Sequence, residues 1–144
     1  MNKDTKTKLF LVDDDALFLK LLEIEFLQHA DFEIETYLTG ELCLANLSHN
    51  PDIIVLDYFL NGIDQEAMNG IEVLDKILTI NSDIPVVMLS SQDKIDVAID
   101  CMHHKAVDYV VKSETAFIRL QKIIASIMDR KKLEKTLNWY MDRI

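Results

Sequence analysis

The chain has 144 residues, of which 49% are hydrophobic and 28% charged, with three glycines and two prolines. This composition suits one globular domain and excludes collagen-like or disordered structure. The formal net charge of −10 argues against direct binding of nucleic acid, because that binding relies on lysine and arginine side chains at phosphates. No apolar run approaches the roughly 20 residues that cross a bilayer, and segment 1–8 lacks the apolar core of a signal peptide. We therefore expect a cytoplasmic protein without membrane association.

Short apolar runs alternate with amphipathic segments along the chain. The predicted strands are 9–12, 32–37, 53–56, 85–89 and 108–111. The predicted helices are 16–29, 40–47, 70–80, 94–104 and 114–128. Several of the strand runs are almost continuously apolar, which is typical of parallel strands that are covered on both faces. Alternating β–α units therefore predict an α/β protein with a doubly wound, five-stranded parallel sheet.

Apolar residues recur at three- and four-residue spacing in the predicted helices, as in amphipathic helices whose apolar stripe faces the core. In segment 16–29 this stripe consists of Leu17, Leu21, Ile24 and either Leu27 or Gln28. In segment 70–80 it consists of Ile71, Leu74, Ile77 and Leu78, and in segment 94–104 of Ile95, Ala98, Ile99 and Met102.

Polar side chains follow four of the five predicted strands. In chain order they are Asp13, Asp14 and Asp15, then Asp57, then Ser90 and Ser91, and finally Lys112. The carboxyl ends of parallel strands lie at one edge of the sheet, and ligands bind there. We predict that Asp15 and Ser91 cap the helices that follow them, and that the other side chains form one site.

Neighbouring carboxylates either keep a proton or bind a cation together. Because the candidate ligands offer only oxygen, we predict that Asp13, Asp14 and Asp57 bind Mg²⁺, with a backbone carbonyl just past Asp57. A metal-bound aspartate can itself attack a phosphoryl group. Such a transfer depends on placement and on neutralisation of charge, which Lys112 and the hydroxyl of Ser90 would supply. The residues therefore predict phosphorylation of Asp57.

The motifs LFLVDDD, IIVLDY, VVMLSS and DYVVK, in this order, resemble the receiver domains of bacterial two-component response regulators (CheY-like). The resemblance covers residues 8–128 and implies a flavodoxin-like (βα)5 fold. It also implies that the backbone carbonyl of Phe59 binds the metal and that Tyr109 is a switch aromatic that moves with Ser90. We accordingly assign residues 1–128 to a receiver domain and residues 129–144 to a C-terminal helical extension.

The resemblance further implies the partners of this domain. A histidine kinase or phosphotransfer protein would supply the phosphoryl group, and the domain would catalyse only its own phosphorylation and slow dephosphorylation. The signal would leave through the face formed by the fourth helix, the fifth strand and the fifth helix. A downstream protein, a removed output domain or a second copy of the chain would receive it.

The chain departs from the family pattern in the loop after Asp57. Gly70 stands thirteen residues after Asp57, several more than in most relatives, and Asn61 replaces a common proline. We hypothesise that this longer loop alters the choice of kinase or partner.

Three further departures lie elsewhere. Ser113 replaces a proline that relatives reach through a cis peptide bond, and we predict that it caps the next helix. Lys105 stands where a glycine commonly ends a helix, and we interpret Lys105, His103 and His104 as cations near a helix C-terminus. Phe59 and Gln92 occupy positions that tune dephosphorylation in relatives.

Residues 129–144 extend beyond a typical receiver. Their apolar residues at helical spacing are Leu133, Leu137, Tyr140 or Met141, and Ile144. Neither glycine nor proline separates them from the preceding helix, so we predict one helix from 114 to about 143. Its apolar stripe would serve dimerisation or lead into an output domain. The alternative is a tail folded back on the receiver.

Other functional classes are alternatives for the same residues. A small phosphohydrolase with an aspartate nucleophile generally has a second aspartate two residues later, where this chain has Phe59. A receiver-like scaffold that is never phosphorylated would not need the complete set of acid, hydroxyl and lysine. A nucleotide-binding domain would need a glycine-rich loop after the first strand, which the sequence lacks.

Overall fold

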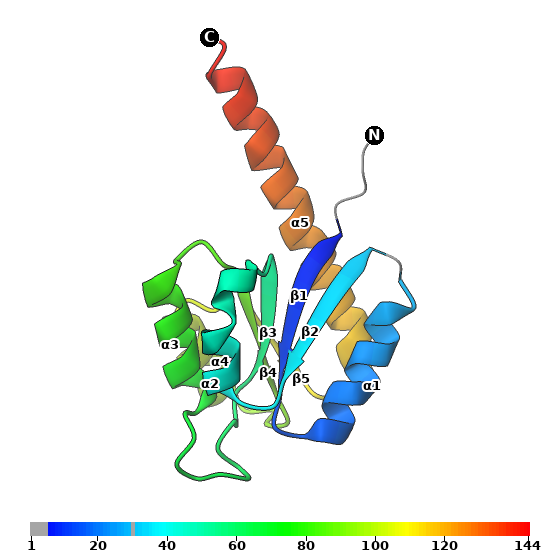
Figure 1. The fold of residues 1–144 in the computed structure, drawn as a ribbon, viewed down its shortest axis with the longest axis vertical. Helices are drawn as coiled ribbons and strands as arrows, with labels where there is room; N and C mark the ends of the chain where they lie inside the picture. Colours follow the sequence, from blue (N-terminus) through cyan, green and yellow to red (C-terminus); the bar gives the residue numbers. More distant parts are fainter. Residues whose placement is uncertain (1–5, 30) are drawn as a thin grey trace.

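A parallel sheet lies at the centre of the computed structural model, which describes residues 6–29 and 31–144 (Figure 1). Its strands are β1 (Thr7–Val12), β2 (Phe32–Tyr37), β3 (Ile53–Asp57), β4 (Val86–Ser90) and β5 (Asp108–Val111). They pair in the order β2-β1-β3-β4-β5, and all the pairs are parallel. The predicted fold class is confirmed. Residues 1–5 of the basic segment 1–8 lie outside the described residues.

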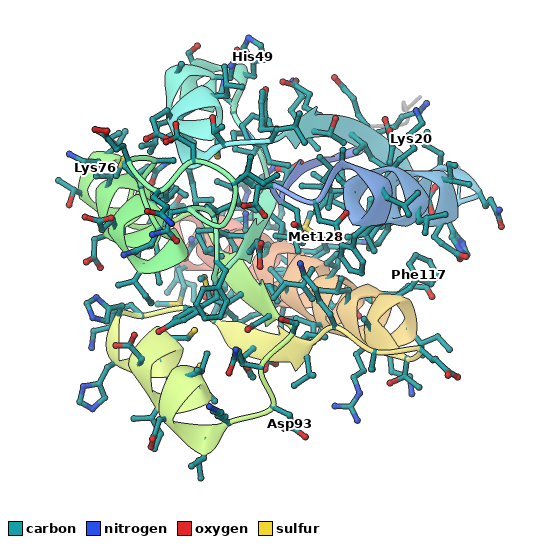
Figure 2. The ribbon with its side chains drawn as sticks, turned by 90° about the horizontal axis from the view of Figure 1, so that it is seen from below. Lys20, His49, Lys76, Asp93, Phe117 and Met128 are labelled. Carbon is teal, nitrogen blue, oxygen red and sulfur yellow. The ribbon has the colours of Figure 1, made fainter. Side chains whose placement is uncertain are left out.

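The helices cover both faces of this sheet (Figure 2). They are α1 (Ala16–Leu27), α2 (Gly40–Ala45), α3 (Gly70–Ile80), α4 (Ile95–His103) and α5 (Ala116–Met141), with a short 3-10 turn η1 (Leu47–His49) after α2. Along β1, Leu9 and Leu11 face the core shared with α1 and α5. Phe10 and Val12 face the core shared with α2 and α3. This alternation explains why β1, β3 and β4 read as continuous apolar runs: side chains on both of their faces are buried.

The stripe predicted for α1 was wrong. Leu17 is 71% exposed, and Leu21, Ile24 and Leu27 are exposed as well. The buried residues of α1 are Leu19, Leu22 and Phe26. The helix carries apolar residues around most of its circumference, so spacing alone does not identify the face that packs on the sheet.

The stripe predicted for α4 was wrong in the same way. Ile95 is 76% exposed, Ile99 and Met102 are also exposed, and Cys101 is the residue of α4 that is fully buried. In α3 the prediction was correct, because Leu74 and Ile77 are buried and Ile71 and Leu78 pack against the same core.

The structure confirms one of the three predicted helix caps. Asp15 caps α1, as predicted: its Oδ1 accepts from the amides of Leu17 and Phe18, each at 3.1 Å. The predictions for Ser91 and Ser113 were wrong. The residues at the N-cap positions of α4 and α5 are Lys94 and Thr115, and neither makes a side-chain cap.

Ser113 instead belongs to the turn before α5, where its Oγ accepts from the amide of Thr115 at 3.3 Å. All peptide bonds among the described residues are trans, including the bond between Lys112 and Ser113. The turn therefore forms without the family's cis bond.

Helix α5 is continuous over 26 residues, or about 39 Å, and its end projects past the amino ends of the strands (Figure 1). This confirms the predicted single helix and rules out a tail that turns back at residue 129. The extension carries the exposed apolar residues Leu133, Leu137, Trp139, Tyr140, Met141 and Ile144. Within the described residues, no helix is long and apolar enough to cross a membrane.

Candidate functional site

Three carboxylates meet at the carboxyl edge of the sheet. Asp13 and Asp14 follow β1, and Asp57 ends the neighbouring strand β3, whose Leu56 is in register with Val12. Each of the three aspartates offers an oxygen within 4.8 Å of the others. Asp13 is 1% exposed and Asp57 is 3% exposed, whereas Asp14 is half-buried. The structure therefore brings together the carboxylates that the sequence pattern placed in one site.

Lys112 follows β5, the edge strand next to β4, and its side chain extends to this cluster. Its amide donates to the carbonyl of Ser90 at 2.7 Å, which continues the pairing of β5 with β4. Its Nζ lies 2.7 Å from Asp13 Oδ2 and 3.5 Å from Asp57 Oδ1. The ammonium also lies 4.7 Å from the centre of the Phe18 ring, which covers it from α1. Lys112 is thus the cation that partly balances the buried acids.

Burial and mutual repulsion set the protonation of the site. Burial first, and then the charge of Asp13, raise the pKa of Asp57 to about 8, although the charge of Lys112 opposes this rise. Burial acts to lower the pKa of Lys112, but its contacts with Asp13 and Asp57 outweigh burial and raise it. Lys112 consequently stays charged while Asp57 has a strong tendency to bind a proton or a further cation.

The hydrogen bonds leave several carboxylate oxygens available. Asp13 Oδ1 accepts from the amide of Asp15 at 2.9 Å. Asp13 Oδ2 is buried without an aligned hydrogen bond, so its contact with Lys112 is an ion pair only. Asp14 Oδ2 accepts from the amide of Gly62 at 3.2 Å. A buried, poorly satisfied oxygen in a cluster of three acids and one lysine fits a small divalent cation that prefers oxygen ligands.

Phe59 lies beside Asp57, and its amide donates to Asp57 Oδ1 at 3.4 Å. Its side chain is exposed and packs edge-to-face against Tyr58. Ligation of a metal by the carbonyl of Phe59 stays a prediction.

Ser90 and Tyr109 both contact the loop between β4 and α4. Ser90 ends β4 one residue past Leu89, the partner of Asp57, and is fully buried. Its Oγ accepts from the amide of Gln92 at 3.0 Å, and the Tyr109 hydroxyl donates to the carbonyl of the same residue. In this structure the two predicted switch residues are therefore joined through Gln92.

The structure also contains a polar network that the sequence did not suggest. The Tyr58 hydroxyl donates to Asp100 Oδ2 at 3.0 Å, which ties the residue after Asp57 to α4. Asp100 Oδ1 lies 3.6 Å from His104 Nε2, and His104 Nδ1 lies 2.8 Å from Asp75 Oδ1 on α3. His104, predicted only as a cation at a helix end, thus bridges two helices. No spacing rule joins residues 42 positions apart, so the sequence carried no signal for this contact.

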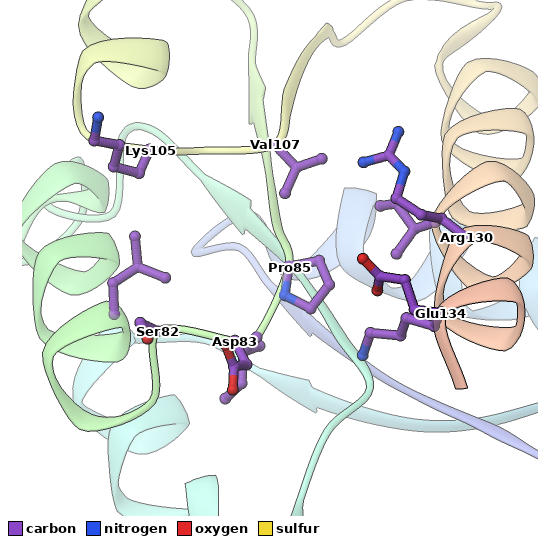
Figure 3. Close-up of a pocket in the computed structure, with 11 residues that line it drawn as sticks. Ser82, Asp83, Pro85, Lys105, Val107, Arg130 and Glu134 are labelled. Atoms are coloured by element: carbon purple, nitrogen blue, oxygen red, sulfur yellow. The ribbon is translucent and has the colours of Figure 1, made fainter. Parts of the chain in front are cut away.

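A cavity of about 500 Å³ lies at the other end of the sheet, where the strands begin (Figure 3). Pro85 and Val107 form apolar walls, and Lys105, Arg130 and Glu134 supply charged groups. None of the predicted site residues lines it.

Comparison with known proteins supports the assignment made from the motifs. The family described as response regulator receiver domain matches residues 9–125. Protein-glutamate methylesterase/protein-glutamine glutaminase 2 of Rhodopseudomonas palustris is 35% identical over 113 residues, which are 76% of this chain and 29% of that protein. Transcriptional regulatory protein PrrA of Mycobacterium bovis is 32% identical over 109 residues, which are 75% of this chain and 44% of that protein. The chain therefore spans less than half the length of these relatives.

Among solved structures, a CheY-like response regulator receiver domain protein from Methanospirillum hungatei JF-1 superposes with a TM-score of 0.72. It is 21% identical, and the match covers 89% of this chain and 98% of that one. At this identity the likeness concerns the fold alone.

Proposed function

This chain belongs to the family of response regulator receiver domains, and from that premise we propose that it accepts a phosphoryl group on Asp57 and acts as a phosphorylation-dependent signalling switch. The observation that carries the proposal is the buried Asp57 carboxylate, held among Asp13, Asp14 and the Lys112 ammonium. Such a site concentrates the charges that a phosphoryl group requires around a single nucleophile.

The transfer needs one covalent exchange. An ionised oxygen of Asp57 attacks phosphorus, the bond from phosphorus to the donor nitrogen breaks, and its electron pair remains on the donor histidine. Magnesium held by Asp13, Asp14 and Asp57, with the carbonyl of Phe59, would supply neutralising charge for the phosphoryl oxygens. Lys112 is placed to pair with one of these oxygens, because its Nζ is already 3.5 Å from Asp57.

The switch would begin at Ser90. Its hydroxyl oxygen accepts from the amide of Gln92, and a phosphoryl group on Asp57 would offer a charged acceptor for the hydroxyl proton. When Ser90 turns toward that group, its contact with the amide of Gln92 is lost. The carbonyl of Gln92, which accepts from the Tyr109 hydroxyl, is then free to move. The loop before α4 then shifts, and with it α4, which carries the exposed apolar residues Ile95 and Ile99.

The partners in this proposal follow from the family. A histidine kinase or phosphotransfer protein in the cytoplasm supplies the phosphoryl group, and the α4–β5–α5 face passes the signal to a downstream protein, an output domain or a second copy. Residues 1–128 form the receiver and residues 129–144 the helical extension, whose exposed stripe includes Leu133 and Leu137. The chain acts as a switch, and the only reactions we assign to it are its own phosphorylation and slow dephosphorylation.

The test is incubation with Mg²⁺ and acetyl phosphate, followed by intact-mass measurement. We expect one added phosphoryl group, which is absent in Asp57→Asn and retained in Asp64→Asn, a matched change at an exposed acid of the neighbouring loop. An unmodified wild-type chain would leave the scaffold as the remaining function. Continuous turnover of varied phosphate esters would instead identify a phosphohydrolase.

A further inference from the structure

We propose that the long loop between β3 and α3 is part of the magnesium site, with the amide of Gly62 as the group that positions Asp14. This inference rests on the proposed function, because it assigns a role to a neighbour of the predicted metal ligands. Gly62 does not itself contact the metal in this proposal. It acts through Asp14 and is a positioning residue.

The loop is closed at its base against β3. The amide of Gly70 donates to the carbonyl of Tyr58 at 3.0 Å, so the chain leaves and re-enters the fold at adjacent points. A Cβ at Gly70 would lie 2.3 Å from the carbonyl oxygen of Asp57, a separation that only glycine permits. Asn69 and Glu72 form a reciprocal cap at the start of α3. The base of the loop is therefore fixed against the backbone of Asp57 and Tyr58.

Two further contacts fix the body of the loop, which extends beyond the carboxyl ends of the strands (Figure 1). The amide of Met68 donates to Glu41 Oε2 of α2 at 2.9 Å. The amide of Gly62 donates to Asp14 Oδ2 at 3.2 Å, across 48 positions of sequence. The loop thus bridges α2 and the acidic cluster, and its body contacts that cluster through Asp14, in addition to the amide of Phe59 that donates to Asp57 at the start of the loop.

Gly62 approaches Asp14 closely. A Cβ built at Gly62 would lie 3.3 Å from Asp14 Oδ2. The backbone of Gly62 does not adopt a positive φ, so the glycine serves close approach and not an unusual conformation. An alanine at position 62 keeps the amide hydrogen and requires a shift of only a few tenths of an ångström.

Asp14 is the carboxylate that most needs such a restraint. Asp13 and Asp57 are buried and contact Lys112, whereas Asp14 is half-buried and forms no ion pair among the described residues. The amide of Gly62 occupies one oxygen of Asp14 and limits rotation of the carboxylate, leaving the other oxygen for the cation. Groups that orient a metal ligand in this way typically contribute about 10–100-fold in metal affinity. The coupling is reciprocal, so bound Mg²⁺ also holds the loop against Asp14.

The decisive experiment is titration calorimetry of the full chain with Mg²⁺. Gly62→Pro removes the amide hydrogen, and we expect Mg²⁺ to bind about 10–100-fold more weakly. Gly62→Ala keeps the amide and should weaken binding by less than this range. Gln65→Pro is the matched proline control, because Gln65 occupies the second position of the turn closed by Ala67 and Asp64, where proline is favoured.

A second measurement does not depend on any variant at position 62. Amide hydrogen exchange of the wild-type chain should slow at Gly62 when Mg²⁺ is added, and this slowing should be absent in Asp14→Ala. Equal Mg²⁺ affinity of wild type and a folded Gly62→Pro, or exchange at Gly62 that Mg²⁺ leaves unchanged, overturns the inference while the metal site stands. A wild-type chain that binds no Mg²⁺ overturns the metal site of the proposed function itself.

Discussion

The ammonium of Lys112 makes its shorter contact with Asp13, at 2.7 Å, and its longer one with Asp57, at 3.5 Å. Lys112 supplies positive charge to the acidic cluster, where Asp13 Oδ2 has no aligned hydrogen bond of its own. This pairing leaves Asp57 as the more weakly compensated acid, which agrees with its pKa of about 8.

The first prediction concerns this lysine. Lys112→Ala removes the cation and leaves buried carboxylates uncompensated, so the free energy of unfolding in EDTA should fall by as much as about 3 kcal/mol. Added Mg²⁺ should stabilise the variant more than it stabilises the wild type, because the cluster then carries more negative charge. Urea unfolding with and without Mg²⁺ measures both effects. Lys122→Ala, an exposed lysine of α5, is the control, and equal stability of Lys112→Ala and wild type would contradict the ion pair.

The second prediction concerns pH. The folded-state pKa of Asp57 is about 8, against an ordinary value of 3.8. Between these values the folded chain holds a proton that the unfolded chain releases, so the free energy of unfolding should fall as pH rises from about 4 to about 8. The contribution of Asp57 to this slope is at most about 1.4 kcal/mol per pH unit.

Asp57→Asn should flatten this fall and should be more stable than wild type near pH 8 in EDTA. Urea unfolding at a series of pH values makes the comparison, with Asp83→Asn as an exposed control. A variant whose pH profile parallels that of the wild type would show that Asp57 titrates normally.

The third prediction concerns the link from Tyr58 to α4. Tyr58→Phe removes the donor to Asp100 and should lower the free energy of unfolding by about 1 kcal/mol. Amide exchange around Asp100 should become faster, because α4 loses one of its attachments to the segment after β3. Tyr140→Phe, at an exposed position of the extension, should change neither quantity. Unaltered exchange in Tyr58→Phe would mean that the contact does not restrain α4.

The fourth prediction concerns the end of α4. Lys105 has a φ of 75°, in the left-handed region that favours glycine. Lys105→Gly should raise the free energy of unfolding by up to about 1 kcal/mol, since relief of this strain exceeds the added entropy of the unfolded chain. Lys105→Ala removes the charge but keeps the strain, so thermal unfolding of both variants separates the two causes. A gain in Lys105→Ala equal to that in Lys105→Gly would point to charge.

The fifth prediction concerns the extension. Lys131 Nζ donates to the carbonyl of Asp52 at 3.0 Å, and the apolar residues that follow, such as Leu133 and Leu137, are exposed. A chain that ends after Lys132 should therefore keep its free energy of unfolding within about 0.5 kcal/mol of the full chain. A loss well beyond that, measured by urea unfolding at low protein concentration, would show that the residues after Lys132 also stabilise the receiver.

Several features of the fold were predictable because their signals are local or follow from parallel pairing. Asp15 caps the helix directly after it, and a capping side chain reaches only the next few amides. Asp13, Asp57 and Lys112 meet because each stands at or just past the end of a parallel strand, and such strands all end at one edge of the sheet. The roles of these residues in phosphoryl transfer stay predictions.

Other local signals were ambiguous. The apolar residues of α1 and α4 lie around much of each helix, so Leu17 and Ile95 matched helical spacing and are nevertheless exposed. Ser91 and Ser113 are residues that often cap helices, but α4 and α5 begin a few residues later than either serine. The preference of serine for N-cap positions has less influence on where a helix begins than the tertiary packing that sets the course of the preceding loop.

The amino-acid sequence by itself determined the alternation of strands and helices, the parallel sheet and the acids and lysine at its edge, because hydrophobic periodicity and strand direction are properties of short segments. Only the tertiary structure decided that Lys112 pairs first with Asp13, that Tyr58 binds Asp100, and that Gly62 reaches Asp14. These contacts join residues 42 to 99 positions apart, and each depends on the exact course of a loop. Local patterns carry no information about such pairings, because they form only when packing has already placed both partners.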